Sequence, residues 1–369
     1  MPRSLQPDKK LFGITLALCF LGVVMVFSAS AVTAKQLYGN GYVFLIRQLL
    51  WLVVGLFGMI RLMHFDYRKL RQPRVIYPSL AAVLLMLIGV LFLDRTHATH
   101  RWMHAGPVSL QPSEFAKLVV ILYLAWFLEL RMQPGSFGIN NLKHTLLPAL
   151  GPILFMLVLI LREPDMGTSC MIFLIALVML CEAGVSMKYV GGVALASIPA
   201  VVFLIVHAQY RYERVLAFFS PGSDPQGRGF QLMQSLIAVG SGGLTGVGLM
   251  ESKQKLFYLP EAHTDFIYAV LCEELGYIGA VAVLVLFGFY AWRGFRAAYR
   301  APDAFGRLLA LGITTLVVGQ ALVNLSVVLG LMPTKGIPLP FISYGGSSLL
   351  VMLLATGVLL NISQHAEAP

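Results

Sequence analysis

Residues 11–27 read LFGITLALCFLGVVMVF, an apolar run of 17 residues without a charged side chain. The hydrocarbon core of a bilayer is about 30 Å thick and needs roughly 17–25 apolar residues per helix. The run therefore predicts a membrane-spanning helix that extends to about residue 34. Because the apolar core of a secretory signal peptide has only ~7–15 residues, we interpret this segment as an uncleaved first helix.

Similar apolar runs recur along the whole chain. They predict ten membrane helices in a single domain over residues 1–369, with a 57-residue loop, residues 208–264, between the seventh and the eighth. The predicted helices cover residues 11–34, 43–63, 75–93, 112–130, 145–162, 167–182, 186–207, 265–290, 307–331 and 342–362. The predicted fold class is an all-α polytopic membrane protein.

The composition agrees with a protein of the membrane. Hydrophobic residues make up 58% and charged residues 12%, whereas soluble domains carry about 25% charged residues. The net charge is +10, but the basic residues lie in short clusters between the apolar runs. This placement predicts contact with anionic lipid head groups and argues against nucleic acid as a partner. The four cysteines lack the spacing of a metal site.

Basic residues also predict the orientation of the chain, because short cytoplasmic loops carry an excess of Lys and Arg. With a cytoplasmic N-terminus, the inner segments hold 15 basic residues and the outer segments, without the long loop, hold seven. We therefore expect both termini in the cytoplasm and the long loop on the opposite, extracytoplasmic side.

Two ionisable residues stand at the start of the fourth predicted helix, in the stretch Gln111-Pro-Ser-Glu-Phe-Ala-Lys117. Glu114 and Lys117 are three residues apart, which places them on one helical face. An ionisable pair near the membrane usually faces a polar cavity. A pair that only positions the helix fits the spacing equally well, so both interpretations stay open.

The long loop ends in Leu259-Pro-Glu-Ala-His-Thr-Asp265, where the eighth helix is predicted to begin. In the first turn of that helix the dipole would stabilise the Asp265 anion, whereas partial burial would favour its neutral form. A carboxylate balanced between these effects is a candidate general base. From spacing alone, an aspartate that merely stabilises the helix start is the simpler interpretation.

Two glycine-rich stretches do not predict a nucleotide site. The run 240–248 has Thr245 where a dinucleotide fingerprint would need glycine, and no strand–helix unit surrounds it. Its backbone amides remain a weak candidate for an anion-binding nest. Gly345 and Gly346 stand beside two serines at a predicted helix start, where close helix packing is the simpler interpretation and phosphate binding the alternative.

Four stretches together resemble the SEDS family (shape, elongation, division and sporulation). In chain order they are Gln111–Lys117, Leu259–Phe266, Glu273–Gly276 and Pro338–Ser348. The resemblance implies a ten-helix peptidoglycan glycosyltransferase of the bacterial cytoplasmic (inner) membrane. Such an enzyme polymerises lipid II into glycan strands at the extracytoplasmic face and releases undecaprenyl pyrophosphate. Residues 333–336 resemble the division-type members or their sporulation relatives, and residues 28–30 resemble the division type. Septal wall synthesis during cell division is therefore expected, with sporulation as the alternative setting.

The resemblance also implies the site. The family's essential aspartate corresponds to Asp265, which we expect to take the proton from the acceptor GlcNAc 4-hydroxyl in a single inverting displacement. The substrate-binding candidates are Arg101, Trp102, Gln111, Ser113, Glu114, Lys117, Arg211, Arg214, Lys255, Glu261, His263, Lys335, Ser343, Tyr344, Gly345, Gly346 and Ser347. The basic ones are expected to face the leaving pyrophosphate, with Lys117 and Arg101 nearest the motifs. A divalent cation, Mg²⁺ or Mn²⁺, is the one cofactor considered.

The implied partner is a class B penicillin-binding protein, a transpeptidase with one membrane helix, together with other membrane proteins of the division machinery. Three alternatives remain: an elongation-type polymerase, a lipid II flippase, and a scaffold that only recruits its partner. Gln320 and Asn324 would line a flippase pathway or make interhelical hydrogen bonds. The concentration of polar residues on one side of the membrane favours the enzyme.

Overall fold

The computed structural model describes residues 6–93, 101–105, 108–220, 227, 229–256 and 258–366. Each of the ten predicted segments falls on a helix. These helices are α1 (Lys9–Tyr38), α2 (Val43–Met63), α3 (Pro73–Leu93), α4 (Pro112–Met132), α5 (Leu147–Arg162), α6 (Met166–Glu182), α7 (Met187–Val206), α10 (Ile267–Tyr299), α11 (Ala304–Val328) and α12 (Gly346–His365).

Eight of the described helices are long and apolar enough to cross a membrane, and the chain is a multi-pass α-helical membrane protein. The two predicted spans outside this set are α4 and α6. Helix α4 carries four charged residues, and α6 has only 17 residues. Both nevertheless pack among the spanning helices, and Glu114 and Lys117 of α4 form an ion pair there.

Shorter elements connect the spans. The predicted long loop contains two helices, α8 (Gln209–Phe219) and α9 (Phe230–Ser241), and strands β1 (Met103–Ala105) and β2 (Val108–Leu110) form an antiparallel hairpin before α4. Two further turns are η1 (Tyr67–Arg71) and η2 (Leu142–Leu146). The sequence did not predict the hairpin, because three-residue strands show too little alternation to detect.

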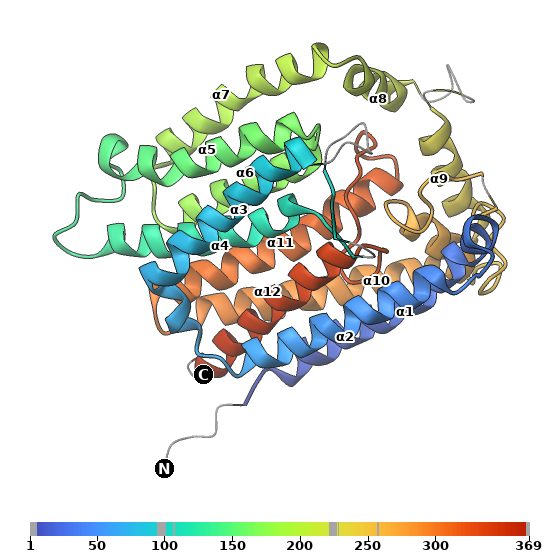
Figure 1. Cartoon of the computed structure of the whole chain (residues 1–369), viewed down its shortest axis with the longest axis horizontal. Helices are drawn as coiled ribbons and strands as arrows, with labels where there is room; N and C mark the ends of the chain where they lie inside the picture. Colours follow the sequence, from blue (N-terminus) through green and yellow to red (C-terminus); the bar gives the residue numbers. More distant parts are fainter. Residues whose placement is uncertain are drawn as a thin grey trace.

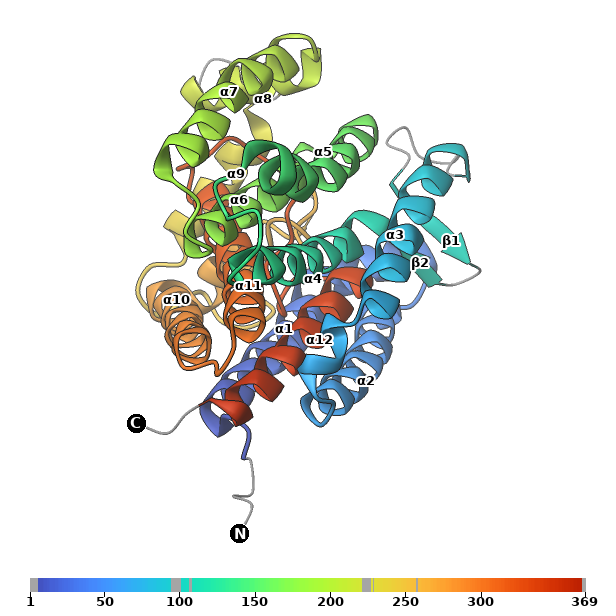
Figure 2. The same ribbon diagram turned by 90° about the vertical axis from the view of Figure 1, so that its left-hand side faces the viewer.

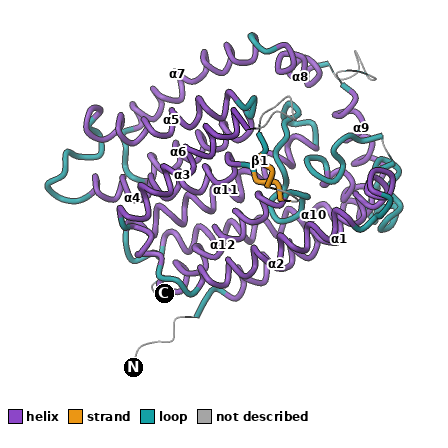
Figure 3. Tube along the Cα trace, viewed as in Figure 1, coloured by secondary structure: helices purple, strands orange, loops and turns teal. Residues whose placement is uncertain are grey.

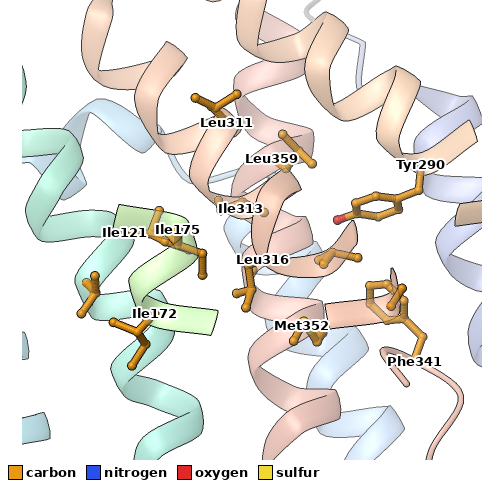
Figure 4. Packing of buried hydrophobic residues seen from close by; sticks show 14 of the residues in the cluster. Ile121, Ile172, Ile175, Tyr290, Leu311, Ile313, Leu316, Phe341, Met352 and Leu359 are labelled. Atoms are coloured by element: carbon orange, nitrogen blue, oxygen red, sulfur yellow. The ribbon is translucent and has the colours of Figure 1, made fainter. Parts of the chain in front are cut away.

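Helices α11 and α12 lie at the centre of the bundle. Helix α11 contacts α4, α6, α10 and α12, while α12 contacts α2, α4 and α10 (Figures 1 and 2). Ile175 of α6, Leu316 of α11 and Met352 of α12 belong to the buried apolar cluster that joins these helices (Figure 4). This close-packed centre fixes the helix ends that carry the polar motifs.

Helix α7 lies apart from this centre. It runs along the outer edge of the molecule and contacts only α6 and α8 closely (Figure 1). Only 6% of the most apolar 18-residue stretch of α7 is buried within the protein. In a bilayer such an apolar surface faces lipid, which replaces the protein contacts that α7 lacks.

The two ends of the bundle differ. Both termini lie at one end, where the Asp8 backbone N–H donates to Ser363 Oγ at 3.3 Å (Figure 1). Loops that connect the spans gather around the hairpin at the other end (Figure 3). Three connecting segments are held at this end by hydrogen bonds. They are the hairpin, which bonds to the start of α12, the glycine-rich run 240–248, which bonds to α10, and residues 329–345, which bond to the loop before α10.

The start of α10 corrects one prediction. Helix α10 begins at Ile267, so Asp265 lies two residues before the helix and not in its first turn. The reason is a turn closed on Glu261, whose carbonyl accepts from the N–H groups of Thr264 and Phe266, both at 3.2 Å. Glu261 itself has a φ of 55°, in the left-handed region. The dipole argument for Asp265 is therefore weaker than expected.

Candidate functional site

Helix α10 is interrupted at Gly276, which has a φ of 64° and a ψ of −164°. The glycine-rich run packs against this break. Four backbone hydrogen bonds cross the junction: Tyr277 N to Gly243 O (2.9 Å), Ile278 N to Leu244 O (3.2 Å), Val247 N to Glu273 O (3.0 Å) and Gly248 N to Glu274 O (3.1 Å). They replace the helical hydrogen bonds lost at the break. In a membrane, where water cannot bond to free N–H and C=O groups, such replacement is needed.

The glycine run is therefore a packing element. A Cβ at Gly246 would lie 2.0 Å from the Glu274 carbonyl oxygen, and one at Gly242 would lie 2.0 Å from that of Cys272. Only glycine allows so close an approach between two backbones. Since two amides of the run already bond to α10, the geometry does not support the anion-binding nest.

Glu273 and Glu274 anchor the next part of the loop, and both side chains are buried within the protein. Glu273 accepts hydrogen bonds from the Ser252 hydroxyl and from the backbone N–H of Lys253 at 3.0 Å. Glu274 accepts from Lys255 Nζ at 2.8 Å and from the hydroxyl of Ser28 in α1 at 2.6 Å. The loop that leads to Asp265 is thus tied to both α1 and α10.

Asp265 is held in place by a hydrogen bond to its backbone carbonyl, and its side chain has no partner among the described residues. The Asn324 amide donates to the Asp265 carbonyl at 2.8 Å and to the Ile337 carbonyl at 2.7 Å, which joins the two loop segments. A Cβ at Gly336 would lie 2.9 Å from Asp265 Oδ2, so glycine leaves room for the carboxylate. Among the described residues, no side chain or N–H group forms a hydrogen bond or ion pair with that carboxylate.

The surroundings of Asp265 favour its neutral form. Burial, and to a smaller extent the charge of Glu261, raise the pKa of the Asp265 carboxyl to about 7. The guanidinium groups of Arg214 and Arg101 lower this pKa, which places both within electrostatic range of the carboxylate. A carboxyl that exchanges its proton near neutral pH suits a general base.

Asp165 joins the starts of α4 and α6. Its carboxylate caps α6 by accepting from the N–H and the hydroxyl of Thr168, at 3.0 and 2.8 Å. It also accepts from the Gln111 amide at 3.2 Å and from the Ser113 hydroxyl at 3.3 Å. Two predicted substrate-binding residues, Gln111 and Ser113, therefore position Asp165, whose charge also raises the pKa of Asp265.

Arg101 lies over the turn between α5 and α6. Its guanidinium donates to the carbonyls of Glu163 at 2.7 Å and Pro164 at 2.5 Å. The Glu163 side chain is fully buried, and neither of its oxygens has a hydrogen-bond partner among the described residues. Burial, and then the charge of Asp165, raise the pKa of Glu163 to about 9, so this side chain is neutral at pH 7. Arg101 therefore keeps its positive charge without a carboxylate partner, and Trp102 lies beside it, half-buried.

Two of the predicted cations are committed to buried ion pairs. Lys117 Nζ lies 2.8 Å from Glu114 Oε1 and donates to Gln320 Oε1 at 2.7 Å. Lys255 is bonded to Glu274 in the same way. Both lysines are buried, so this geometry does not support their contact with a substrate. For Glu114 and Lys117 it favours the interpretation that the pair positions α4.

The other predicted cations form no ion pair with a carboxylate in the described part of the chain. They are Arg101, Arg211, Arg214 and Lys335. The Arg211 guanidinium donates to the Tyr210 hydroxyl at 2.7 Å, and that hydroxyl donates to the Pro164 carbonyl at 3.3 Å. Lys335 Nζ lies 3.7 Å from Cys170 Sγ of α6. These contacts place the free positive charges around the turn between α5 and α6.

The segment before α12 holds the Asp265 loop in place. The Ser343 hydroxyl donates to the Thr264 carbonyl at 2.6 Å, and the Tyr344 N–H donates to the His263 carbonyl at 3.0 Å. The rings of His263 and Tyr344 both pack against Phe44 of α2, with centroids 4.8 and 5.0 Å away.

The remaining predicted site residues also have structural partners. The Ser347 hydroxyl accepts from the Gln111 N–H at 3.0 Å. Gly345 precedes α12, and a Cβ at Gly346 would lie 2.1 Å from Trp51 Nε1, which favours close packing over phosphate binding. Glu261 is exposed, and its carboxylate accepts from the Thr264 hydroxyl at 2.8 Å.

A resident metal ion is not supported by the ligand set. Within the part of the chain that the structure describes, no three side chains of His, Cys, Asp or Glu come together to hold one. Mg²⁺ is commonly held by one or two carboxylates together with substrate phosphates, so the predicted divalent cation stays a prediction and no step of the reaction is assigned to it.

The sequence analysis did not identify Asp165 or Glu163 as parts of the site. One signal was present: an aspartate followed three residues later by threonine, before an apolar helix, is typical of a helix N-cap. A carboxylate in such an apolar context normally faces protein or a polar cavity.

Comparisons with known proteins agree over the whole chain. The model of a family described as "Cell cycle protein" (FTSW_RODA_SPOVE) matches residues 9–368. A probable peptidoglycan glycosyltransferase FtsW of Trichlorobacter lovleyi is 43% identical, covering 98% of this chain and 94% of its own. Stage V sporulation protein E of Bacillus subtilis is 40% identical over 99% of both chains.

Solved structures show the same fold. A chain from the study "Structural coordination of polymerization and crosslinking by a peptidoglycan synthase complex" superposes with a TM-score of 0.78, at 33% identity over 97% of both chains. The rod shape determining protein RodA of Thermus thermophilus superposes with a TM-score of 0.72, at 29% identity over 100% of both chains.

Proposed function

This chain belongs to the FtsW, RodA and SpoVE family of cell cycle proteins, and from that premise we propose that it polymerises lipid II into glycan strands with Asp265 as the general base. It is a peptidoglycan glycosyltransferase, in agreement with the names of its FtsW relatives. One observation carries the site assignment: the Asp265 carboxylate is held in place by its backbone yet makes no ion pair in the described structure.

The proposed reaction needs one base and several cations. Asp265 accepts the proton of the acceptor GlcNAc 4-hydroxyl while that oxygen attacks the donor anomeric carbon. The bond to the undecaprenyl pyrophosphate breaks as the β-1,4 bond forms, so the α-linked donor is inverted. Arg101, Arg211, Arg214 and Lys335 are the side chains available to meet the negative charge that develops on the leaving group.

The proposed setting is the bacterial cytoplasmic membrane, with both termini in the cytoplasm and Asp265 at the extracytoplasmic end. The excess of basic residues near the termini supports this orientation. A class B penicillin-binding protein is the proposed partner, since a similar chain was solved in a study of a peptidoglycan synthase complex. The identity with FtsW proteins supports a role in cell division.

The test is polymerisation of purified lipid II by the chain together with its transpeptidase. Asp265→Asn and Asp265→Ala should lower the rate by about two to four orders of magnitude. Glu251→Gln, an exposed carboxylate in the same loop, is the matched control and should retain the wild-type rate. Each variant is checked for folding and for binding to the partner.

Normal polymerisation by both Asp265 variants would overturn the base assignment. If the wild type with its partner makes no polymer, while lipid II crosses liposomes that contain the chain, the protein is a flippase instead.

A further inference from the structure

A cavity of 230 Å³ opens at the end of the bundle where α1 begins and α12 ends. It lies between the start of α1, the last turns of α10 and the end of α12. Three arginines of α10 line it, together with Asp8 and Ser363. The arginines are Arg293, Arg296 and Arg300, whose spacing of three and then four residues places them on one helical face.

This cavity has an excess of positive charge. Among the described lining residues, Asp8 is the one carboxylate, and its Oδ2 lies 2.5 Å from Nη2 and 2.6 Å from Nε of Arg293. Arg296 and Arg300 form no ion pair with a carboxylate in the described residues. Within the described residues, two guanidinium groups therefore line the cavity without a carboxylate partner, and Ser363 lines it too.

The position of the cavity along α10 corresponds to the level of lipid head groups. Trp292 and Tyr299 flank the arginines and are 53% and 72% exposed. Exposed Trp and Tyr side chains are enriched at the membrane–water interface. The Trp292 ring also contacts the Arg293 guanidinium, 5.6 Å from its centroid.

An apolar stripe leads from the bilayer to the arginines. Val285, Phe289 and Trp292 are exposed on α10 at spacings of four and then three residues, and Arg296 follows four residues later. One face of the helix thus passes from apolar side chains to an aromatic residue and then to cations. Acyl chains, a glycerol backbone and a phosphate follow each other in the same order in a phospholipid.

We propose that this cavity binds the phosphate of an anionic phospholipid. Guanidinium groups donate two parallel hydrogen bonds to phosphate oxygens, and basic pockets between membrane helices are known to suit anionic head groups. Free inorganic phosphate offers the same oxygens, but it would make no use of the apolar stripe.

The test uses the full chain, delipidated in a neutral detergent and titrated with phosphatidylglycerol, with bound lipid counted by native mass spectrometry. The variant Arg296→Gln/Arg300→Gln should bind about tenfold more weakly or worse than the wild type. The control Lys35→Gln/Lys253→Gln removes two exposed charges from the end of α1 and from the loop before α10 and should bind like the wild type. Arg296→Lys/Arg300→Lys keeps the charge and should retain most of the affinity, which separates loss of charge from loss of fold.

Two competitors identify the source of the phosphate. If phosphatidylcholine does not replace phosphatidylglycerol and inorganic phosphate does not displace it, the proposal stands. Equal binding by the wild type and the double glutamine variant would overturn it. Displacement by inorganic phosphate would identify a free-phosphate site, and equal binding of phosphatidylcholine would remove the preference for anionic lipid; either result contradicts the proposal.

Discussion

Two sets of charged residues lie at the same end of this bundle. One set is paired with opposite charges within the protein and the other is not. Lys117 with Glu114, and Lys255 with Glu274, form buried pairs with N–O distances of 2.8 Å. Asp265 and Lys335 are only partly buried and have no oppositely charged partner among the described residues. Both sets come from stretches that look equally important in the sequence.

The difference separates positioning from chemistry. A buried ion pair fixes two elements relative to each other but leaves nothing to donate to a ligand. An unpaired group near the surface remains free to exchange a proton or to meet the charge of a substrate. On this comparison the two buried pairs hold the scaffold, while Asp265 and the free cations are the groups that we propose act on the substrate.

The largest stability effect is expected at Lys255. Lys255→Met leaves the Glu274 carboxylate buried without its counter-charge, which should destabilise the fold by about 3–5 kcal/mol. Thermal unfolding in detergent measures this, with Lys253→Met as the matched control, because Lys253 is exposed two residues away. Equal unfolding temperatures for the two variants would show that the pair does not hold the loop.

A smaller loss is expected where the glycine run meets the break in α10. Gly246→Ala places a Cβ against the Glu274 carbonyl at a φ of 83°, which should cost about 2 kcal/mol or more through overpacking and backbone strain. Gly240→Ala is the control, since it lies in α9 with no atom within 4 Å of its Cβ position. If both variants unfold like the wild type, the junction is looser than described.

The smallest predicted effect on stability is a gain, and it concerns Asp265. Its pKa is raised from 3.8 to about 7 in the folded chain, so the folded state binds more protons than the unfolded state between these values. The free energy of unfolding therefore falls as pH rises through this window. Asp265→Asn removes that loss and should stabilise the protein by about 1 kcal/mol near pH 8.

Near pH 4, where the Asp265 carboxyl is neutral in the folded state, the stabilisation by Asp265→Asn should largely disappear. Unfolding curves at the two pH values measure the difference. A variant that is less stable than the wild type at both values would mean that the Asp265 anion makes favourable contacts in the folded protein.

Much of the fold could be predicted from local sequence. Each long apolar run became a helix, because a run such as 11–27 is stable in a bilayer whatever surrounds it. The packing role of Gly346 also followed from general rules for small residues in membrane helices. The break at Gly276 could not be predicted, since it depends on the glycine run that packs against it from another part of the chain.

The site was only partly predictable, because its contacts join residues far apart in sequence. Lys117 reaches Gln320, which is 203 residues away, and Glu274 binds Ser28, which is 246 residues away. No local pattern indicates that these partners neutralise or occupy the charges. From the sequence, Lys117 and Lys255 were therefore candidate site residues in the same way as Asp265. Their buried ion pairs distinguish them from it.

The measurement that tests the account most directly is the pH dependence of lipid II polymerisation by the wild-type chain with its transpeptidase. A general base must be deprotonated, so the rate should rise with pH and level off above an apparent pKa near 7. Asp265→Glu should show a lower rate and a shifted midpoint. A rate that stays constant from about pH 5 to pH 9, with the protein folded throughout, would contradict a role for the Asp265 carboxylate in proton transfer.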